Sequence, residues 1–105
     1  MERRKARITV LKRMDNRKVQ EEHKSDGARL GPCRLFEDGQ TFVAGWRIPE
    51  GFCDTAWADI HSDLVMIQWG GNPGYVGPDH TMISCCRDGF RPVVFKIERL
   101  DEPVS

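Results

Sequence analysis

Residues 54–71 read DTAWADIHSDLVMIQWGG and carry the clearest secondary-structure pattern in the chain. Their apolar side chains recur at spacings of four, four and three residues, which places them on one face of an α-helix. These side chains are Ala56, Ile60, Leu64 and Ile67. Asp54 suits the positive end of a helix dipole, and Gly70-Gly71 ends the helix. The pattern therefore predicts one long helix over residues 54–69.

Extended segments precede and follow this helix. The strand patterns fall in residues 6–13, 40–45, 81–87 and 92–100. The last two segments flank Asp88-Gly89, which predicts a hairpin. Val93, Phe95 and Ile97 alternate with polar residues and should face the core. The sequence predicts an α+β fold, with a small, mostly antiparallel sheet packed against the helix over 54–69. Residues 15–25 are polar and fit either a short exposed helix or a loop.

The size and composition are those of one ordinary globular domain. The chain has 105 residues, of which 39% are hydrophobic and 30% charged, enough for a single core. We expect residues 1–5 and 101–105 to be flexible ends of this domain. No run of about 18 apolar residues is present to make a transmembrane helix. The N-terminus does not read as a secretory signal, and we expect the protein to be cytoplasmic.

Charge is distributed unevenly along the chain. Residues 1–24 contain nine Lys or Arg and four Asp or Glu, a net charge of +5, and residues 25–105 carry a net charge of −5. A basic arm can bind nucleic acid, but no aromatic side chain is interleaved here. The interpretation we favour is that residues 6–13 form an exposed edge strand protected by charge. Such a strand could pair with another chain, including a second copy in a homodimer.

Four cysteines, Cys33, Cys53, Cys85 and Cys86, are the main candidates for chemistry. In a reducing cytoplasm they should be thiols or metal ligands rather than disulfides. Cys53 comes just before the predicted helix, where the positive helix end stabilises a thiolate. Asp54 and burial beside aromatic residues oppose that ionisation. Cys53 is therefore a candidate nucleophile whose activation the sequence leaves open.

The adjacent cysteines should not act together. Neighbouring side chains of a strand point to opposite faces, so only one of Cys85 and Cys86 should face a given site. A zinc or iron centre using Cys33, Cys53, Cys85 and Cys86 is an alternative interpretation. The chain has no C-x-x-C knuckle, which is the spacing that makes a cysteine count a strong metal signal.

Three tryptophans also deserve consideration as site residues. Trp46 and Trp69 lie at predicted element ends near the Gly- and Pro-rich residues 70–79, where aromatic side chains often line a pocket. They could equally cover the edge of the core with their N–H groups in water. Trp57 lies on the helix and should belong to the core.

Several blocks of the chain resemble a small family of functionally uncharacterised prokaryotic proteins that is common in anaerobes. The blocks are GPCRLFEDGQTF (31–42), PEGFCDTAWADI (49–60), GG (70–71) and CCRDGFRPVVFKIERL (85–100). The resemblance covers most of residues 6–100 and implies a shared pattern that includes Cys33, Cys53, Cys86, Trp57 and Asp59. The family often has an aromatic residue two positions before Ala-Trp, where this chain has Asp54-Thr55. It has no established activity to carry over.

Together these observations lead to one hypothesis and two alternatives. The leading hypothesis is a thiol-lined, Trp-walled pocket at the start of the helix, which binds or acts on a small molecule through Cys53. The neighbouring binding residues would be Cys33, Cys86, Trp57, Asp59, Trp46, Trp69, Arg87 and Arg91, with the two arginines offering charge to an anionic ligand. The alternatives are the zinc or iron site and a non-catalytic interaction module that uses the basic N-terminal strand. Whether the protein is an enzyme is left open.

Overall fold

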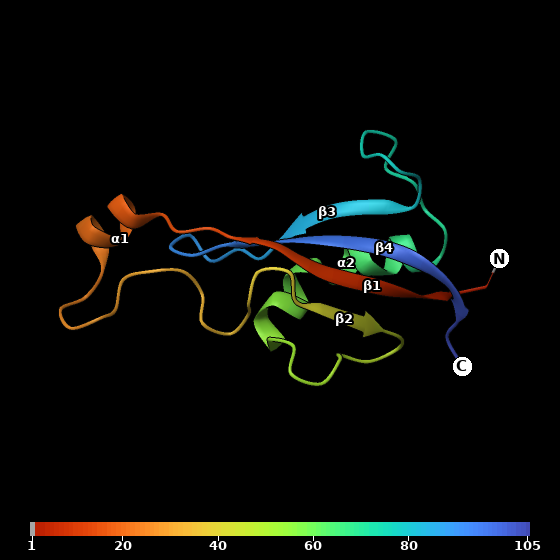
Figure 1. The fold of residues 1–105 in the computed structure, drawn as a ribbon, viewed down its shortest axis with the longest axis horizontal. Helices are drawn as coiled ribbons and strands as arrows, with labels where there is room; N and C mark the ends of the chain where they lie inside the picture. Colours follow the sequence, from red (N-terminus) through yellow and green to blue (C-terminus); the bar gives the residue numbers. More distant parts are fainter. Residues whose placement is uncertain (1) are drawn as a thin grey trace.

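One antiparallel sheet and one long helix packed on its face form the body of the protein (Figure 1). The computed structural model describes residues 2–105 and confirms the predicted α+β class. Its elements in chain order are β1 (Arg4–Arg13), α1 (Arg17–His23), β2 (Thr41–Ala44), α2 (Asp54–Gln68), β3 (Thr81–Cys85) and β4 (Val93–Pro103). The sheet order is β2-β1-β4-β3, and every neighbouring pair is antiparallel.

The long helix and the hairpin are confirmed close to their expected positions. Helix α2 ends at Gln68 with Trp69 as its C-cap, and all four predicted apolar positions on it are buried. Strands β3 and β4 pair across the Asp88-Gly89 turn, with Ser84 opposite Phe95. The polar segment 15–25 contains the short helix α1. Neither helix within residues 2–105 is long and apolar enough to cross a membrane.

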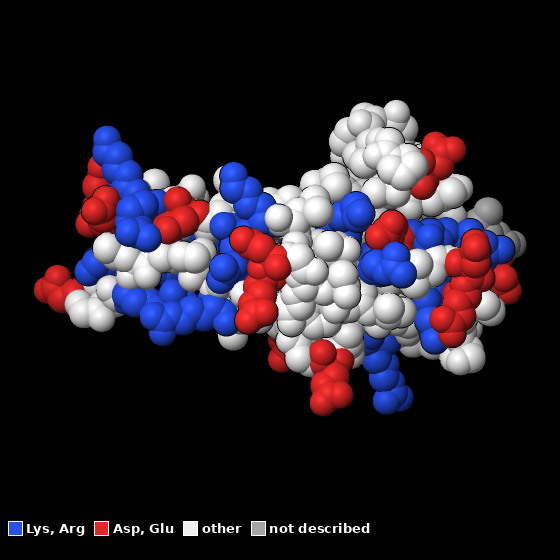
Figure 2. All heavy atoms as spheres, in the orientation of Figure 1, with Lys and Arg blue, Asp and Glu red and all other residues white. Residues whose placement is uncertain are grey.

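The first strand is central, so the prediction of an exposed edge strand was wrong. Strand β1 has hydrogen-bonded neighbours on both sides, β2 and β4. Its basic side chains are tolerated there because acidic side chains of β4 lie beside them. The ion pairs are Arg4–Asp101, Lys5–Glu102 and Arg7–Glu98. The two charge signs are interspersed over the face shown in Figure 2. Over Ala6–Thr9 both edges of β1 are occupied, so this stretch is not free to pair with a strand of another chain.

Parts of both chain ends belong to the sheet. Residues 4–5 and 101–103, predicted to be flexible, belong to β1 and β4, with Arg4 opposite Pro103. The Val104 N–H donates a hydrogen bond to the Arg3 carbonyl at 3.0 Å. Cross-strand pairing therefore places residues 4–5 and 101–103 in the sheet, while Met1 lies outside the described residues.

Four phenylalanines form the centre of the core at the start of α2. This phenylalanine cluster consists of Phe36, Phe42, Phe52 and Phe95, none of which is more than 9% exposed. Ring centroids lie 5.1 Å apart for Phe36 and Phe52 and 5.3 Å apart for Phe36 and Phe95. Edge-to-face contacts at such distances add to the stabilisation from burial. The cluster joins the loop before β2, strand β2 itself, the loop before α2 and strand β4.

A second lobe extends beyond the end of the sheet. Helix α1, the irregular segment 24–40 and the loop between β3 and β4 lie together at this end (Figure 1). The lobe gives the molecule an elongated form of 51 × 29 × 20 Å. The radius of gyration is 15.0 Å, compared with about 13 Å for a domain of this length.

We predict that Phe95→Ala lowers the free energy of unfolding by about 3–5 kcal/mol, because it leaves a cavity at the centre of the phenylalanine cluster. The matched control is Ile83→Ala on β3, whose side chain is 39% exposed and whose loss should cost about 1 kcal/mol or less. Urea denaturation followed by tryptophan fluorescence measures both variants. Equal losses in the two variants would contradict the placement of the core.

Candidate functional site

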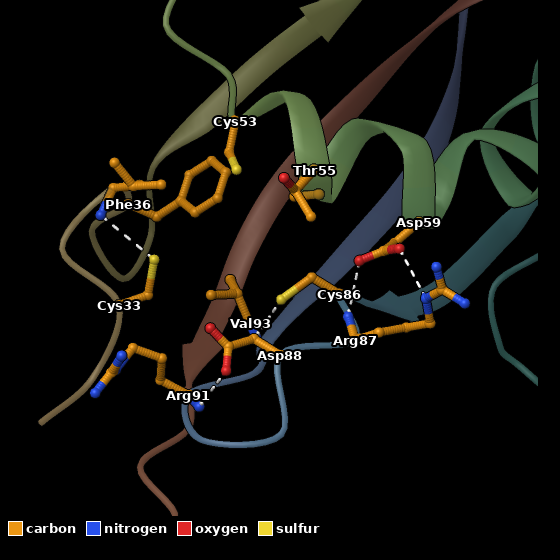
Figure 3. Close-up of a pocket in the computed structure, with 12 residues that line it drawn as sticks. Cys33, Phe36, Cys53, Thr55, Asp59, Cys86, Arg87, Asp88, Arg91 and Val93 are labelled. Atoms are coloured by element: carbon orange, nitrogen blue, oxygen red, sulfur yellow. Dashed lines mark hydrogen bonds and ion pairs between the residues drawn. The ribbon is translucent and has the colours of Figure 1, made fainter. Parts of the chain in front are cut away.

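A pocket of about 700 Å³ lies where the second lobe meets the start of α2 (Figure 3). Three of the four cysteines line it, and they come from three separate segments: Cys33 from the loop before β2, Cys53 from the N-cap of α2 and Cys86 from the residue that follows β3. The remaining lining residues are Leu35, Phe36, Thr55, Ala56, Asp59, Arg87, Asp88, Arg91 and Val93. The spatial convergence of Cys33, Cys53 and Cys86 agrees with the arrangement expected from sequence.

The phenylalanine cluster explains why these three segments meet. Phe36 follows Cys33 by three residues, and Phe52 directly precedes Cys53. Phe95 follows Val93, the backbone partner of Cys86, by two residues. Burial of the three rings against one another therefore brings the three thiols to one side of the core.

Cys53 is the N-cap residue of α2. Its backbone is extended, with φ −68° and ψ 126°, and its carbonyl accepts the first helical hydrogen bond from Trp57. Among residues 2–105 no side-chain hydrogen bond caps this helix. Thr55 and Ala56 of the first helical turn also line the pocket. The Cys53 sulfur is thus placed beside the positive end of a 15-residue helix.

The Cys33 thiol is held within an irregular segment. Its sulfur accepts a hydrogen bond from the Leu35 N–H at 3.4 Å. Its carbonyl accepts one from the Arg13 guanidinium at 2.9 Å, and Arg13 also pairs with Asp38. Strand β1 therefore fixes the backbone of Cys33 through Arg13.

The two adjacent cysteines point to different places, as the strand geometry predicts. The Cys86 sulfur accepts a hydrogen bond from the Val93 N–H at 3.2 Å and lines the pocket. Cys85 is exposed, and its thiol donates to the Cys86 carbonyl at 3.1 Å. The Val93 N–H therefore bonds to the Cys86 sulfur, whereas the Cys86 N–H donates to the Val93 carbonyl in the usual way.

Asp59 holds the loop that follows Cys86. Its carboxylate accepts hydrogen bonds from the backbone N–H of Arg87 at 2.8 Å and from the Arg87 Nε at 2.9 Å. The Asp59 side chain is only 4% exposed, whereas that of Arg87 is 88% exposed. The guanidinium therefore neutralises the enclosed carboxylate while remaining in water. One helical turn further on, Asp63 accepts a hydrogen bond from Ser84 of β3 at 2.7 Å.

The two arginines line the pocket, but both make contacts within the protein. Figure 3 shows the Arg87 side chain turned toward Asp59 and away from Cys33. The Arg91 guanidinium donates to the carbonyls of Gly31 and Arg29 at 2.9 and 3.1 Å. Both groups connect the β3–β4 loop to its surroundings, and their role toward an anionic ligand stays a prediction.

The predicted tryptophan wall is absent from the pocket: of the described residues, no tryptophan lines it. Trp46 and Trp69 lie toward the opposite end of α2, where Trp69 is the C-cap and Arg3 stacks on the Trp46 ring at 4.4 Å. The 15-residue helix separates its two ends by about 20 Å, so Trp69 cannot reach the thiols. Trp57 packs against the core instead, with its ring 5.9 Å from that of Phe52.

The described residues do not provide the group of ligands that the zinc or iron alternative requires. In the part of the chain that the structure describes, no three His, Cys, Asp or Glu side chains are grouped so that they could hold a metal ion. All four cysteines are free thiols. A zinc or iron site built from Cys33, Cys53, Cys85 and Cys86 would therefore need a different arrangement of these side chains.

Several site residues were not predicted from the sequence. Leu35, Phe36, Thr55, Ala56, Asp88 and Val93 line the pocket without having been assigned to it. For Thr55 and Ala56 a signal did exist, because they lie four and three positions before Asp59, respectively, on the same side of a helix. Asp88 was recognised only as a turn residue. Its carboxylate accepts hydrogen bonds from the N–H groups of Phe90 and Arg91.

Comparisons of the chain with protein-family models, curated proteins and solved structures found no match. The family resemblance of the sequence blocks therefore stays a prediction.

We predict that Cys85 is a slow nucleophile despite its exposure. Partial burial of its thiol raises its pKa, and the charges of Cys86 and Asp59 raise the pKa further. Its alkylation by iodoacetamide should therefore reach half of its maximal rate at a higher pH than that of free cysteine. Cys86→Ser removes one source of repulsion and should lower this midpoint. Peptide mapping by mass spectrometry follows the reaction, and a midpoint at or below that of free cysteine would contradict the prediction.

Proposed function

We propose that this protein uses the pocket to bind or chemically modify a small molecule through the Cys53 thiol. The observation that carries the proposal is the convergence of Cys33, Cys53 and Cys86 on one pocket. We also propose a cytoplasmic location, because a reducing compartment keeps such thiols free.

Cys53 is the preferred reactive group because of its position on α2. Its sulfur lies at the positive end of the helix dipole and at the pocket. Asp54 in the first turn is exposed, so water weakens its opposing charge. Cys33 and Cys86 are assigned supporting roles, because a backbone N–H holds each sulfur in place and neither residue lies at the start of a helix.

The pocket lining indicates the class of molecule. Phe36, Ala56 and Val93 offer apolar surface beside the sulfurs, and Thr55 adds a hydroxyl group. Thiolates are soft nucleophiles that react readily with polarisable electrophilic carbon. The preferred partner is therefore a small, partly apolar molecule with an electrophilic centre, for which Arg87 or Arg91 would offer charge to an anionic substituent.

The proposal predicts that Cys53 is activated by the fold. In the native protein at pH 7.5, iodoacetamide should alkylate Cys53 at least about three-fold faster than in the urea-unfolded chain, because only the folded protein provides the helix N-terminus. Labelling is quantified by peptide mapping, with Cys85→Ser as the control that removes a thiol outside the pocket. Native labelling of Cys53 that is slower than in the unfolded chain would overturn the proposal.

A further inference from the structure

Gln20 is a buried polar residue whose side chain connects three parts of the second lobe. It lies on α1 and has no exposed surface. Its Nε2 donates to Asp15 at 2.9 Å and to the Phe90 carbonyl at 2.7 Å, and its Oε1 accepts the Gly31 N–H at 2.8 Å. The Gly31 carbonyl is a longer third contact of Nε2 at 3.4 Å.

Gly31 is the point at which this network reaches the pocket, because it precedes Cys33 by two residues. It is buried and has φ +112°, a backbone conformation that residues other than glycine rarely adopt. Its carbonyl also accepts the Arg91 Nε at 2.9 Å. Both polar backbone groups of Gly31 are therefore held by side chains of other segments.

The chain around Cys33 depends on such contacts because it has no regular structure. Within the described residues, segment 24–40 contains neither helix nor strand. Phe36 fixes this segment on the C-terminal side of Cys33 through its burial in the phenylalanine cluster. On the N-terminal side the corresponding anchor is Gly31, held by Gln20.

We propose that Gln20 is a positioning residue for Cys33: by holding Gly31 through the Gln20 amide, α1 keeps the Cys33 thiol at the wall of the pocket. The inference rests on the proposed function only in giving Cys33 a role at a working site. The second lobe then positions the Cys33 thiol, one of the three thiols at the pocket.

Gln68 provides a matched control at the other end of α2. It is equally buried, and its Nε2 donates to the carbonyls of Ala44 and Gly45 at 3.1 and 3.0 Å. Its Oε1 accepts two hydrogen bonds from the guanidinium of Arg3. Loss of either glutamine removes a comparable network, but only Gln20 is connected to the pocket.

The test compares Gln20→Met with Gln68→Met, since methionine keeps the side-chain length and removes the hydrogen bonds. Iodoacetamide labelling rates of Cys33, Cys53 and Cys86 are measured by peptide mapping. In Gln20→Met the Cys33 rate should rise about ten-fold, because the released segment opens locally, while the Cys53 rate changes by less than about two-fold. In Gln68→Met the ratio of the Cys33 and Cys53 rates should stay at the value of the unsubstituted protein. An unchanged ratio in Gln20→Met, or the same change in both variants, would overturn the inference.

A second measurement needs no substitution. In the unsubstituted protein, the Gly31 amide should exchange its hydrogen at least about 100-fold slower than an unstructured peptide, because the Gln20 Oε1 holds it in a buried position. Rapid exchange of Gly31 would overturn the inference even if Gln20→Met fails to fold. Protected Gly31 together with inert Cys53 would instead reject the proposed function and leave the role of Gln20 intact.

Discussion

Packing of the phenylalanine cluster is the interaction on which the rest of the structure depends. Phe36, Phe42, Phe52 and Phe95 come from four different segments, and their burial fixes where α2 begins relative to the sheet. Each ring removes a large apolar area from water, so the cluster supplies much of the free energy that holds these segments together. Because the segments that carry Cys33 and Cys53 also carry a clustered ring, the position of the pocket follows from the packing of the core.

Polar contacts hold the parts of the irregular segments that the apolar core does not fix. The apolar core fixes one side of each irregular segment, and a buried or partly buried polar side chain fixes the other. Gln20 and Arg91 hold the chain before Cys33, and Asp59 holds the chain after Cys86. Such side chains are tolerated in enclosed positions because their hydrogen-bonding groups find partners there. The pocket is consequently bounded by α2 on one side and, on the other, by loop segments that polar side chains hold in place.

The uneven charge of the chain is resolved inside the sheet. Strand β1 contains much of the basic N-terminal segment, and β4 carries acidic residues of the C-terminal segment. Their antiparallel pairing brings Arg7 opposite Glu98 and places Lys5 within 2.8 Å of Glu102. A charge asymmetry that resembles a binding arm in the linear chain thus becomes cross-strand neutralisation in the fold.

The sequence alone determined the helix over 54–69, the final hairpin and the alternation of Val93, Phe95 and Ile97, because these follow from local periodicity and turn residues. It also singled out Cys33, Cys53 and Cys86, and the opposite orientation of Cys85 follows from the two-residue period of a strand. Only the tertiary structure decided that β1 is central, that Trp46 and Trp69 lie far from the thiols and that Gln20 anchors Gly31. Strand order and the partners of a buried amide depend on contacts between residues distant in the chain, and no local pattern records such contacts.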